Sequence, residues 1–164
     1  MGEVSDRLAT LGLALPAVTA PLAAYVPAVL DGDLVFSSGQ LPLVDGKLSD
    51  TGKVGEAAGL IRVERAAELA QVCALNALAA VASVLAGPDG LDQVRVLKVV
   101  GFVASDPGFT EQHRVLNGAS ALIGDVLGDR GVHARSAVGV NALPLDAPVE
   151  VELIVRILGQ PMGP

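Results

Sequence analysis

The stretch that decides the fold is His133-Ala-Arg-Ser-Ala-Val-Gly-Val-Asn-Ala-Leu-Pro-Leu-Asp-Ala-Pro-Val-Glu-Val-Glu-Leu-Ile-Val-Arg-Ile157. Apolar and polar residues alternate with a period of two in both of its halves, and a turn containing proline separates them. This pattern predicts two strands. In the second strand every odd-numbered residue from Val149 to Ile157 is apolar, and the other face carries Glu150, Glu152 and Arg156.

Two charged residues of this stretch stand on faces lined by small residues. Arg135 is flanked by alanine and serine in an otherwise uncharged strand, and Glu150 begins the second strand. Charges on core strands rarely lack a partner or a ligand. In a tight hairpin about residues 143–147 the two would lie on the order of 16 Å apart. They therefore either meet through a different strand order or face each other across a subunit interface. We interpret Glu152 and Arg156 as unrelated surface charges.

These residues favour the binding of a small organic acid. The planar fork of an arginine binds a carboxylate through two hydrogen bonds, and a nearby glutamate can hold a water molecule or pass a proton. The hydroxyl groups of Ser37 and Ser38, at the strand end before Gly39, add polar groups. The sequence therefore predicts a pocket for a small carboxylate.

The other elements follow from local signals. Residues 25–30 and 34–38 predict a hairpin around Asp31-Gly32-Asp33, and residues 94–104 predict a strand covered on both faces. Residues 63–86 and 106–127 predict helices. With a short strand after Gly39, we expect an α+β fold, a mostly antiparallel six-stranded sheet with two helices on one face. The opposite, apolar face has no helix to cover it, which is a reason to oligomerise.

The length and the proline positions predict the domain organisation. At 164 residues the chain fits one domain with a sizeable core. An N-terminal helix over residues 3–13 precedes an extended connection with Pro16 and Pro21. We therefore divide the chain into residues 1–23, the N-terminal helix and connection, and residues 24–159, the main domain.

Composition and motifs exclude several functions. A net charge of -7 and only 2% aromatic residues argue against a nucleic-acid partner. The uncharged stretch 69–87 contains Gln71 and Asn76 and is rich in alanine, so a buried helix is favoured over a membrane span. We expect a cytoplasmic protein without a membrane partner. The single cysteine, Cys73, is expected to serve packing, and the two histidines have no metal-site spacing, so no metal is expected.

Several segments form a recognisable set in their order and spacing: Tyr25-Val, Val35-Phe-Ser-Ser-Gly-Gln-Leu-Pro, Gly101-Phe-Val, Asn117, Ala134-Arg-Ser-Ala-Val-Gly-Val, Leu143-Pro and Val149-Glu-Val-Glu. This set resembles the Rid (reactive intermediate deaminase) superfamily, also called the YjgF-like or "endoribonuclease L-PSP" family. The resemblance implies a chorismate-mutase-like fold and a homotrimer with ligand clefts between subunits. It also implies hydrolysis of enamines and 2-imino acids to 2-keto acids and ammonia, with no cofactor.

The resemblance further implies roles for individual residues. Arg135 would hold the substrate carboxylate, and Glu150 would position water or help protonate the departing nitrogen. Tyr25, Ser38 and Asn117 would line the cleft, and backbone groups of Gly39 and Ala137 would hydrogen-bond the ligand. Two positions depart from the family pattern. Ala137 stands where well-studied members often have cysteine, and the helix reads Asn117-Gly-Ala-Ser, without the usual aromatic residue three positions after the asparagine.

Two other functions compete with a deaminase. A non-catalytic homotrimer that binds small carboxylates as a sensor or regulator would need the same arginine but would show no turnover. A ribonuclease is suggested by the family's name, but the acidic charge and the scarcity of aromatic residues argue against it.

Overall fold

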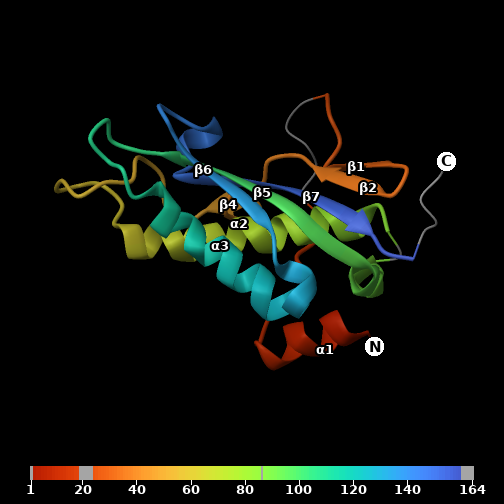
Figure 1. Ribbon diagram of the computed structural model, residues 1–164. Coiled ribbons are helices and arrows are strands. Elements are labelled where there is room, and N and C mark those ends of the chain that lie inside the picture. Colours follow the sequence, from red (N-terminus) through yellow and green to blue (C-terminus); the bar gives the residue numbers. More distant parts are fainter. Residues whose placement is uncertain (1, 19–23, 86, 160–164) are drawn as a thin grey trace.

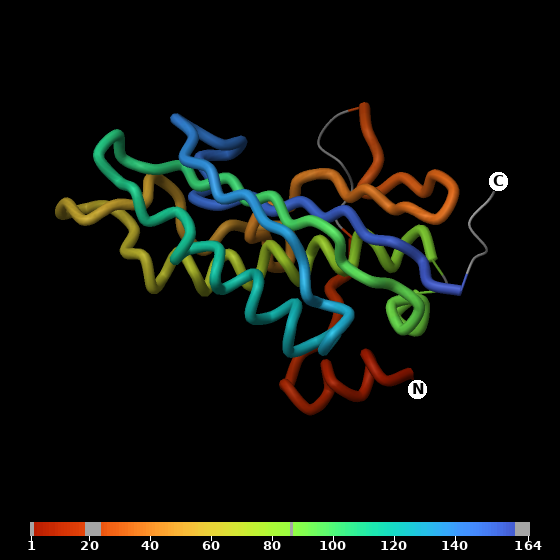
Figure 2. Tube along the Cα trace, in the orientation of Figure 1, coloured from red at the N-terminus to blue at the C-terminus, as the bar shows by residue number. Residues whose placement is uncertain are grey.

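The computed structural model describes residues 2–18, 24–85 and 87–159 and shows a sheet with helices packed beneath it (Figures 1 and 2). The helices are α1 (Glu3–Thr10), α2 (Val63–Ser83) and α3 (Gln112–Leu127), with 3-10 turns η1 (Gly87–Gln93), η2 (Gly128–Gly131) and η3 (Pro144–Asp146). The strands are β1 (Ala28–Asp31), β2 (Leu34–Ser37), β3 (Leu43–Val44), β4 (Lys47–Leu48), β5 (Val94–Ala104), β6 (Ala134–Val140) and β7 (Val149–Ile157). The expected α+β class is confirmed.

The main sheet has the strand order β1-β2-β7-β5-β6. Its pairs are antiparallel except β5 and β6, which run parallel and are joined by α3 as a crossover helix. The six-stranded expectation needs adjustment. The segment after Gly39 forms the separate two-stranded sheet β3-β4 around the Asp45-Gly46 turn, so the main sheet has five strands.

The strands β6 and β7 do not form a hairpin, because β5 lies between them. The strand order therefore differs from a hairpin, but it places Arg135 and Glu150 on opposite faces of the sheet, so it does not bring them together within one chain. The helical crossover explains this order, since a parallel pair needs a long connection and α3 provides it.

Helices α2 and α3 cover one face of the sheet, as expected (Figure 1). The long apolar helix α2 lies inside the fold, and its fully buried residues include Leu78 and Val81. The helix α3 begins at Gln112 rather than near residue 106, because the chain first makes a turn in which the Phe109 amide donates to the Asp106 carbonyl (2.9 Å) and the Phe109 ring is buried.

No helix among the described residues covers the opposite face, which we call the open face. Val29 of β1, Phe36 of β2 and Val138 of β6 are 50%, 41% and 44% exposed on it. Register places Val29, Phe36 and Ile154 in one row across three strands. An apolar sheet face of this kind is typical of a surface that another protein chain covers.

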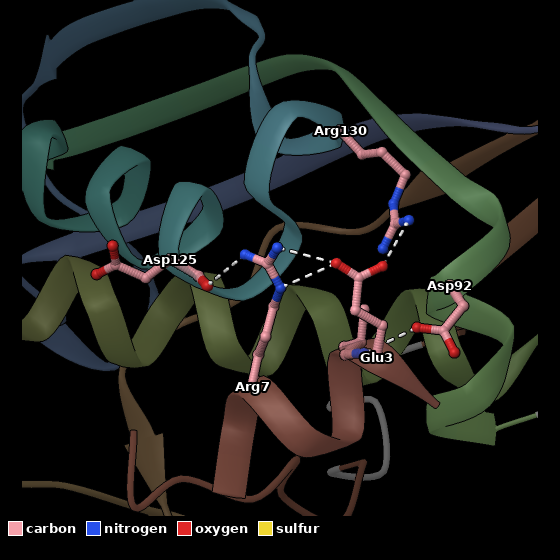
Figure 3. Close-up of polar contacts among 6 residues, drawn as sticks. Glu3, Arg7, Asp92, Asp125 and Arg130 are labelled. Carbon is pink, nitrogen blue, oxygen red and sulfur yellow. Dashed lines mark hydrogen bonds and ion pairs between the residues drawn. The ribbon is translucent and has the colours of Figure 1, made fainter. Parts of the chain in front are cut away.

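The N-terminal helix α1 packs against α3 and η1 and buries Val4 and Leu8 in the core, and polar contacts add to this packing (Figure 3). The Glu3 carboxylate accepts from Arg7 (2.9 Å) and from Arg130 of η2 (3.2 Å), and these arginines lower the pKa of Glu3. The amide of Val4 donates to Asp92 (2.8 Å). Beyond α1, the expected extended connection includes residues 19–23, which lie outside the described residues.

Candidate functional site

Arg135 lies on the edge strand β6, on the helix-covered face of the sheet. Its register partner on β5 is Val99, which in turn pairs with Leu153 of β7. Both neighbours are buried against the helices. Because side chains that pair directly share a face, Arg135 extends toward α3.

Three acceptors of α3 hold the guanidinium group of Arg135. Nη1 donates to the Asn117 side-chain oxygen (3.1 Å) and to the Ser120 hydroxyl (3.0 Å), and Nη2 donates to the His113 carbonyl (3.1 Å). These residues stand at positions i, i+4 and i+7 of the helix and therefore share one side of it. The structure thus brings Arg135 and Asn117 together. Ala137 lies two residues along the same face of β6. We call Arg135, Asn117, Ser120 and the His113 carbonyl the arginine corner.

The arginine corner leaves part of the guanidinium group available. An arginine has five N–H donors, and three of them are used here. The two that have no acceptor among the described residues are on Nε and Nη2. These neighbouring nitrogens form a fork that matches the two oxygens of a carboxylate. The arginine corner can therefore bind a carboxylate without giving up its own contacts.

Glu150 lies on the open face, on the other side of the sheet. It pairs with Phe102 of β5, and Phe102 pairs with the exposed Val138 of β6. Burial, followed by the charge of Glu152, raises the pKa of the Glu150 carboxyl group. Among the described residues no side chain donates a hydrogen bond to it. A partly buried, unpaired carboxyl group with a raised pKa is a candidate for proton transfer.

Of the other predicted residues, Gly39 lies against Glu150, and Ser38 and Tyr25 are linked to Gly39 through the chain and a hydrogen bond to Val26. A methyl group placed on Gly39 would lie 1.7 Å from Oε1 of Glu150, so a larger residue at position 39 would displace the carboxyl group from its present position. The Ser38 hydroxyl donates to the Val26 carbonyl (2.6 Å), and Tyr25, about half exposed, directly precedes Val26. We call Tyr25, Ser38, Gly39 and Glu150 the glutamate corner.

The two corners do not meet within one chain. They use opposite faces of the sheet, and β5 lies between β6, which carries Arg135, and β7, which carries Glu150. Two strand spacings correspond to about 10 Å. The predicted site residues therefore form two half-sites rather than one cleft.

A surface hollow, the single cysteine and the possible metal ligands offer no alternative site for a small acid. A surface hollow of about 510 Å³ lies where β5 and β6 end, but its lining, which includes Ser105, Asp106 and Gln112, has no cationic side chain to attract an acid. Cys73 is fully buried, and burial raises the pKa of its thiol well above the usual range, as befits packing rather than catalysis. Within the described parts of the chain no three His, Cys, Asp or Glu side chains gather to hold a metal ion.

The fold and the two half-sites define an α+β protein of the YjgF-like superfamily. The chain belongs to the Endoribonuclease L-PSP family, whose model matches residues 16–157. It is 42% identical over 158 residues to Protein TCP17 of Trypanosoma cruzi, covering 95% of each chain.

Solved structures agree with this assignment. Atu1372 of Agrobacterium tumefaciens, a protein of unknown function, is 45% identical, with a TM-score of 0.84 over 94% of this chain and 92% of that one. The YjgF gene product of E. coli is 21% identical, with a TM-score of 0.58 over 87% and 94% of the two chains, and it shows the fold alone.

Sequence reasoning missed Ser120, which belongs to the arginine corner, and His133, which contacts Ser120. His133 directly precedes β6, and its Nε2 lies 3.0 Å from the Ser120 hydroxyl that Arg135 also contacts. The spacing of His113, Asn117 and Ser120 predicts that they share one side of a helix. It does not predict that this side faces Arg135, which depends on how α3 packs against β6.

Proposed function

We propose that the protein is a 2-imino acid and enamine deaminase that releases 2-keto acids and ammonia. The observation that carries this proposal is the Arg135 guanidinium, fixed by three acceptors with a two-donor fork left for a carboxylate. Because the fork matches a planar anion, the substrate class is a small acid rather than a neutral imine.

The reaction adds water across a carbon–nitrogen double bond. An enamine such as 2-aminoacrylate first shifts a proton to its methylene carbon and becomes the 2-imino acid. Water then adds to the imine carbon, and the carbon–nitrogen bond breaks to release ammonia and leave the keto group. The reaction involves no net oxidation or reduction, so it requires only water and proton transfer.

Glu150 is the group assigned to proton transfer. Its raised pKa brings the carboxyl group closer to the pH of the cell, where it can both accept and donate a proton. It would position the attacking water or help protonate the departing nitrogen. Gly39 gives the carboxyl group its space, and the backbone groups of Gly39 and Ala137 are proposed ligand contacts.

The two half-sites require association of copies to act together. We infer that the open face of one chain approaches the arginine corner of the next, in a homotrimer with clefts between subunits. The exposed apolar residues of the open face support this arrangement, as does the placement of the corners on opposite faces of the sheet.

The test measures ammonia and pyruvate release from freshly generated 2-iminopropionate. Wild-type turnover is expected, and Arg135→Ala should lose it at least about a hundredfold, because the carboxylate loses a charged, bidentate partner. Arg62→Ala, which removes an exposed arginine paired with Glu56, is the matched control and should keep full activity.

The outcomes separate the competing functions. Turnover that survives Arg135→Ala would contradict the assignment of the carboxylate site. No turnover in either protein, with calorimetric pyruvate binding that needs Arg135, would replace the deaminase with a non-catalytic carboxylate-binding protein.

A further inference from the structure

We propose that Ser120 and His133 are positioning residues, which hold the Arg135 guanidinium in its carboxylate-binding orientation through a directed chain of hydrogen bonds. This inference rests on the proposed function, because it concerns how the carboxylate site of that function is shaped. It assigns a role to two residues that sequence reasoning left without one.

The direction of each hydrogen bond follows from the atoms. The Nδ1 atom of His133 faces the carbonyl oxygen of Gly131, which can only accept, so Nδ1 carries the hydrogen. In the neutral imidazole Nε2 is then an acceptor, and the Ser120 hydroxyl, 3.0 Å away, donates to it. The lone pairs of the same hydroxyl accept from Nη1 of Arg135 at 3.0 Å.

The series of hydrogen bonds ends at the Gly131 carbonyl, a backbone group that is held firmly in place. Gly131 is buried, and a methyl group added to it would lie 2.6 Å from the Ile123 carbonyl oxygen of α3. Only a glycine permits this close approach of η2 to α3. The Gly131 carbonyl is therefore a fixed anchor for His133, which orients Ser120, which in turn orients Arg135.

This series of hydrogen bonds gives the serine at position 120 a role. An arginine side chain has four rotatable bonds, and orienting it for each ligand costs entropy. A hydroxyl whose hydrogen is committed to His133 presents its lone pairs to Nη1 in one direction, so the guanidinium is held before the ligand arrives. An aromatic side chain, which the family resemblance leads one to expect three residues after Asn117, offers no such acceptor when it is phenylalanine.

Positioning predicts an effect on binding rather than on chemistry. The carboxylate contact is made equally in the substrate and in the transition state, so weakening it raises KM and leaves kcat unchanged. Ser120→Ala should raise the Kd of the stable product pyruvate, and the KM for 2-iminopropionate, by about tenfold. The kcat should stay within about twofold. Alanine favours helix, so α3 should remain intact.

Three further variants test the series of hydrogen bonds from His133 through Ser120 to Arg135. Ser120→Thr keeps the hydroxyl and should bind pyruvate nearly as wild type does. His133→Phe removes the acceptor and should raise the Kd about threefold, since Ser120 remains but loses its fixed direction. The double variant Ser120→Ala/His133→Phe should match Ser120→Ala alone, because links in series are not additive. Ser83→Ala, which removes a hydroxyl bonded only within α2, is the matched control.

The experiment is calorimetric titration with pyruvate together with steady-state kinetics, with Arg135→Ala measured alongside. Loss of binding in Arg135→Ala and an unchanged Kd in Ser120→Ala would overturn the positioning role and leave the proposed function intact. A fall in kcat at constant KM for Ser120→Ala would also overturn it, as would additive losses in the double variant. Unchanged binding in Arg135→Ala would instead refute the proposed carboxylate site.

Discussion

The arginine corner and the glutamate corner differ in how complete they are. Arg135 has three protein acceptors on one helix, and its position is fixed within its own chain. Glu150 is partly buried, its pKa is raised, and no described side chain donates to it. One corner is therefore preorganised and the other is left unpaired. The difference supports the proposed division of roles, in which the first corner would bind the ligand and the second would carry out proton transfer in a cleft shared between chains.

The largest change that sharpens this comparison is Glu150→Gln. The amide keeps the size of the side chain but cannot act as a general acid or base at neutral pH, so kcat should fall by about a hundredfold. Pyruvate should still bind within a few-fold of wild type, because the carboxylate contact belongs to the other corner. Steady-state kinetics and calorimetry measure both quantities. A loss of pyruvate binding as large as the loss of turnover would contradict the assignment of binding to one corner and proton transfer to the other.

A smaller effect is expected from Gly39→Ala. The added methyl group would occupy the position 1.7 Å from Oε1 of Glu150, so the carboxyl group must move. We expect a fall in kcat of about tenfold with pyruvate affinity retained, since misplacing a catalytic group costs rate. Gly108→Ala, where an added methyl group meets no atom within 4 Å, controls for glycine replacement. An unchanged kcat in Gly39→Ala would contradict a role in proton transfer for Glu150 in the position that the structure gives it.

The smallest effect is on stability and depends on pH. The raised pKa means that the folded state binds the Glu150 proton more tightly than the unfolded state does, so ionised Glu150 destabilises the fold. That penalty is complete above the raised pKa and disappears below the ordinary pKa of a glutamate. The Tm of Glu150→Gln should therefore slightly exceed that of wild type at pH 7, and the advantage should vanish as the pH falls to about 4. A Tm below that of wild type at neutral pH would contradict the buried, unpaired state of this carboxyl group.

The elements that the sequence predicts well are those with local signals. The run of residues 94–104, apolar on both faces, gives β5 with its observed bounds, and the Asp31-Gly32-Asp33 turn gives the β1-β2 hairpin. The sixth strand and the start of α3 were less well predicted. The segment after Gly39 turns back at Asp45-Gly46 before it can join the main sheet, and a buried turn at Phe109 delays the helix.

The site shows the same limit more clearly. The alternation in β6 and β7 identifies Arg135 and Glu150, but not that β5 separates their strands and that they use opposite faces. Strand order depends on contacts far apart in the sequence, which periodicity does not report. Ser120 and His133 were missed for the same reason, because a serine and a histidine 13 residues apart become neighbours only when η2 folds back on α3.

The most direct test of the central claim is subunit complementation. Arg135→Ala and Glu150→Gln chains, each inactive alone, are unfolded, mixed in equal amounts and refolded together, and pyruvate release from 2-iminopropionate is measured. If each cleft takes its arginine and its glutamate from different chains, about a quarter of the clefts in random trimers regain both groups, and about a quarter of wild-type activity should return. No activity above that of the separate variants would contradict a site shared between chains.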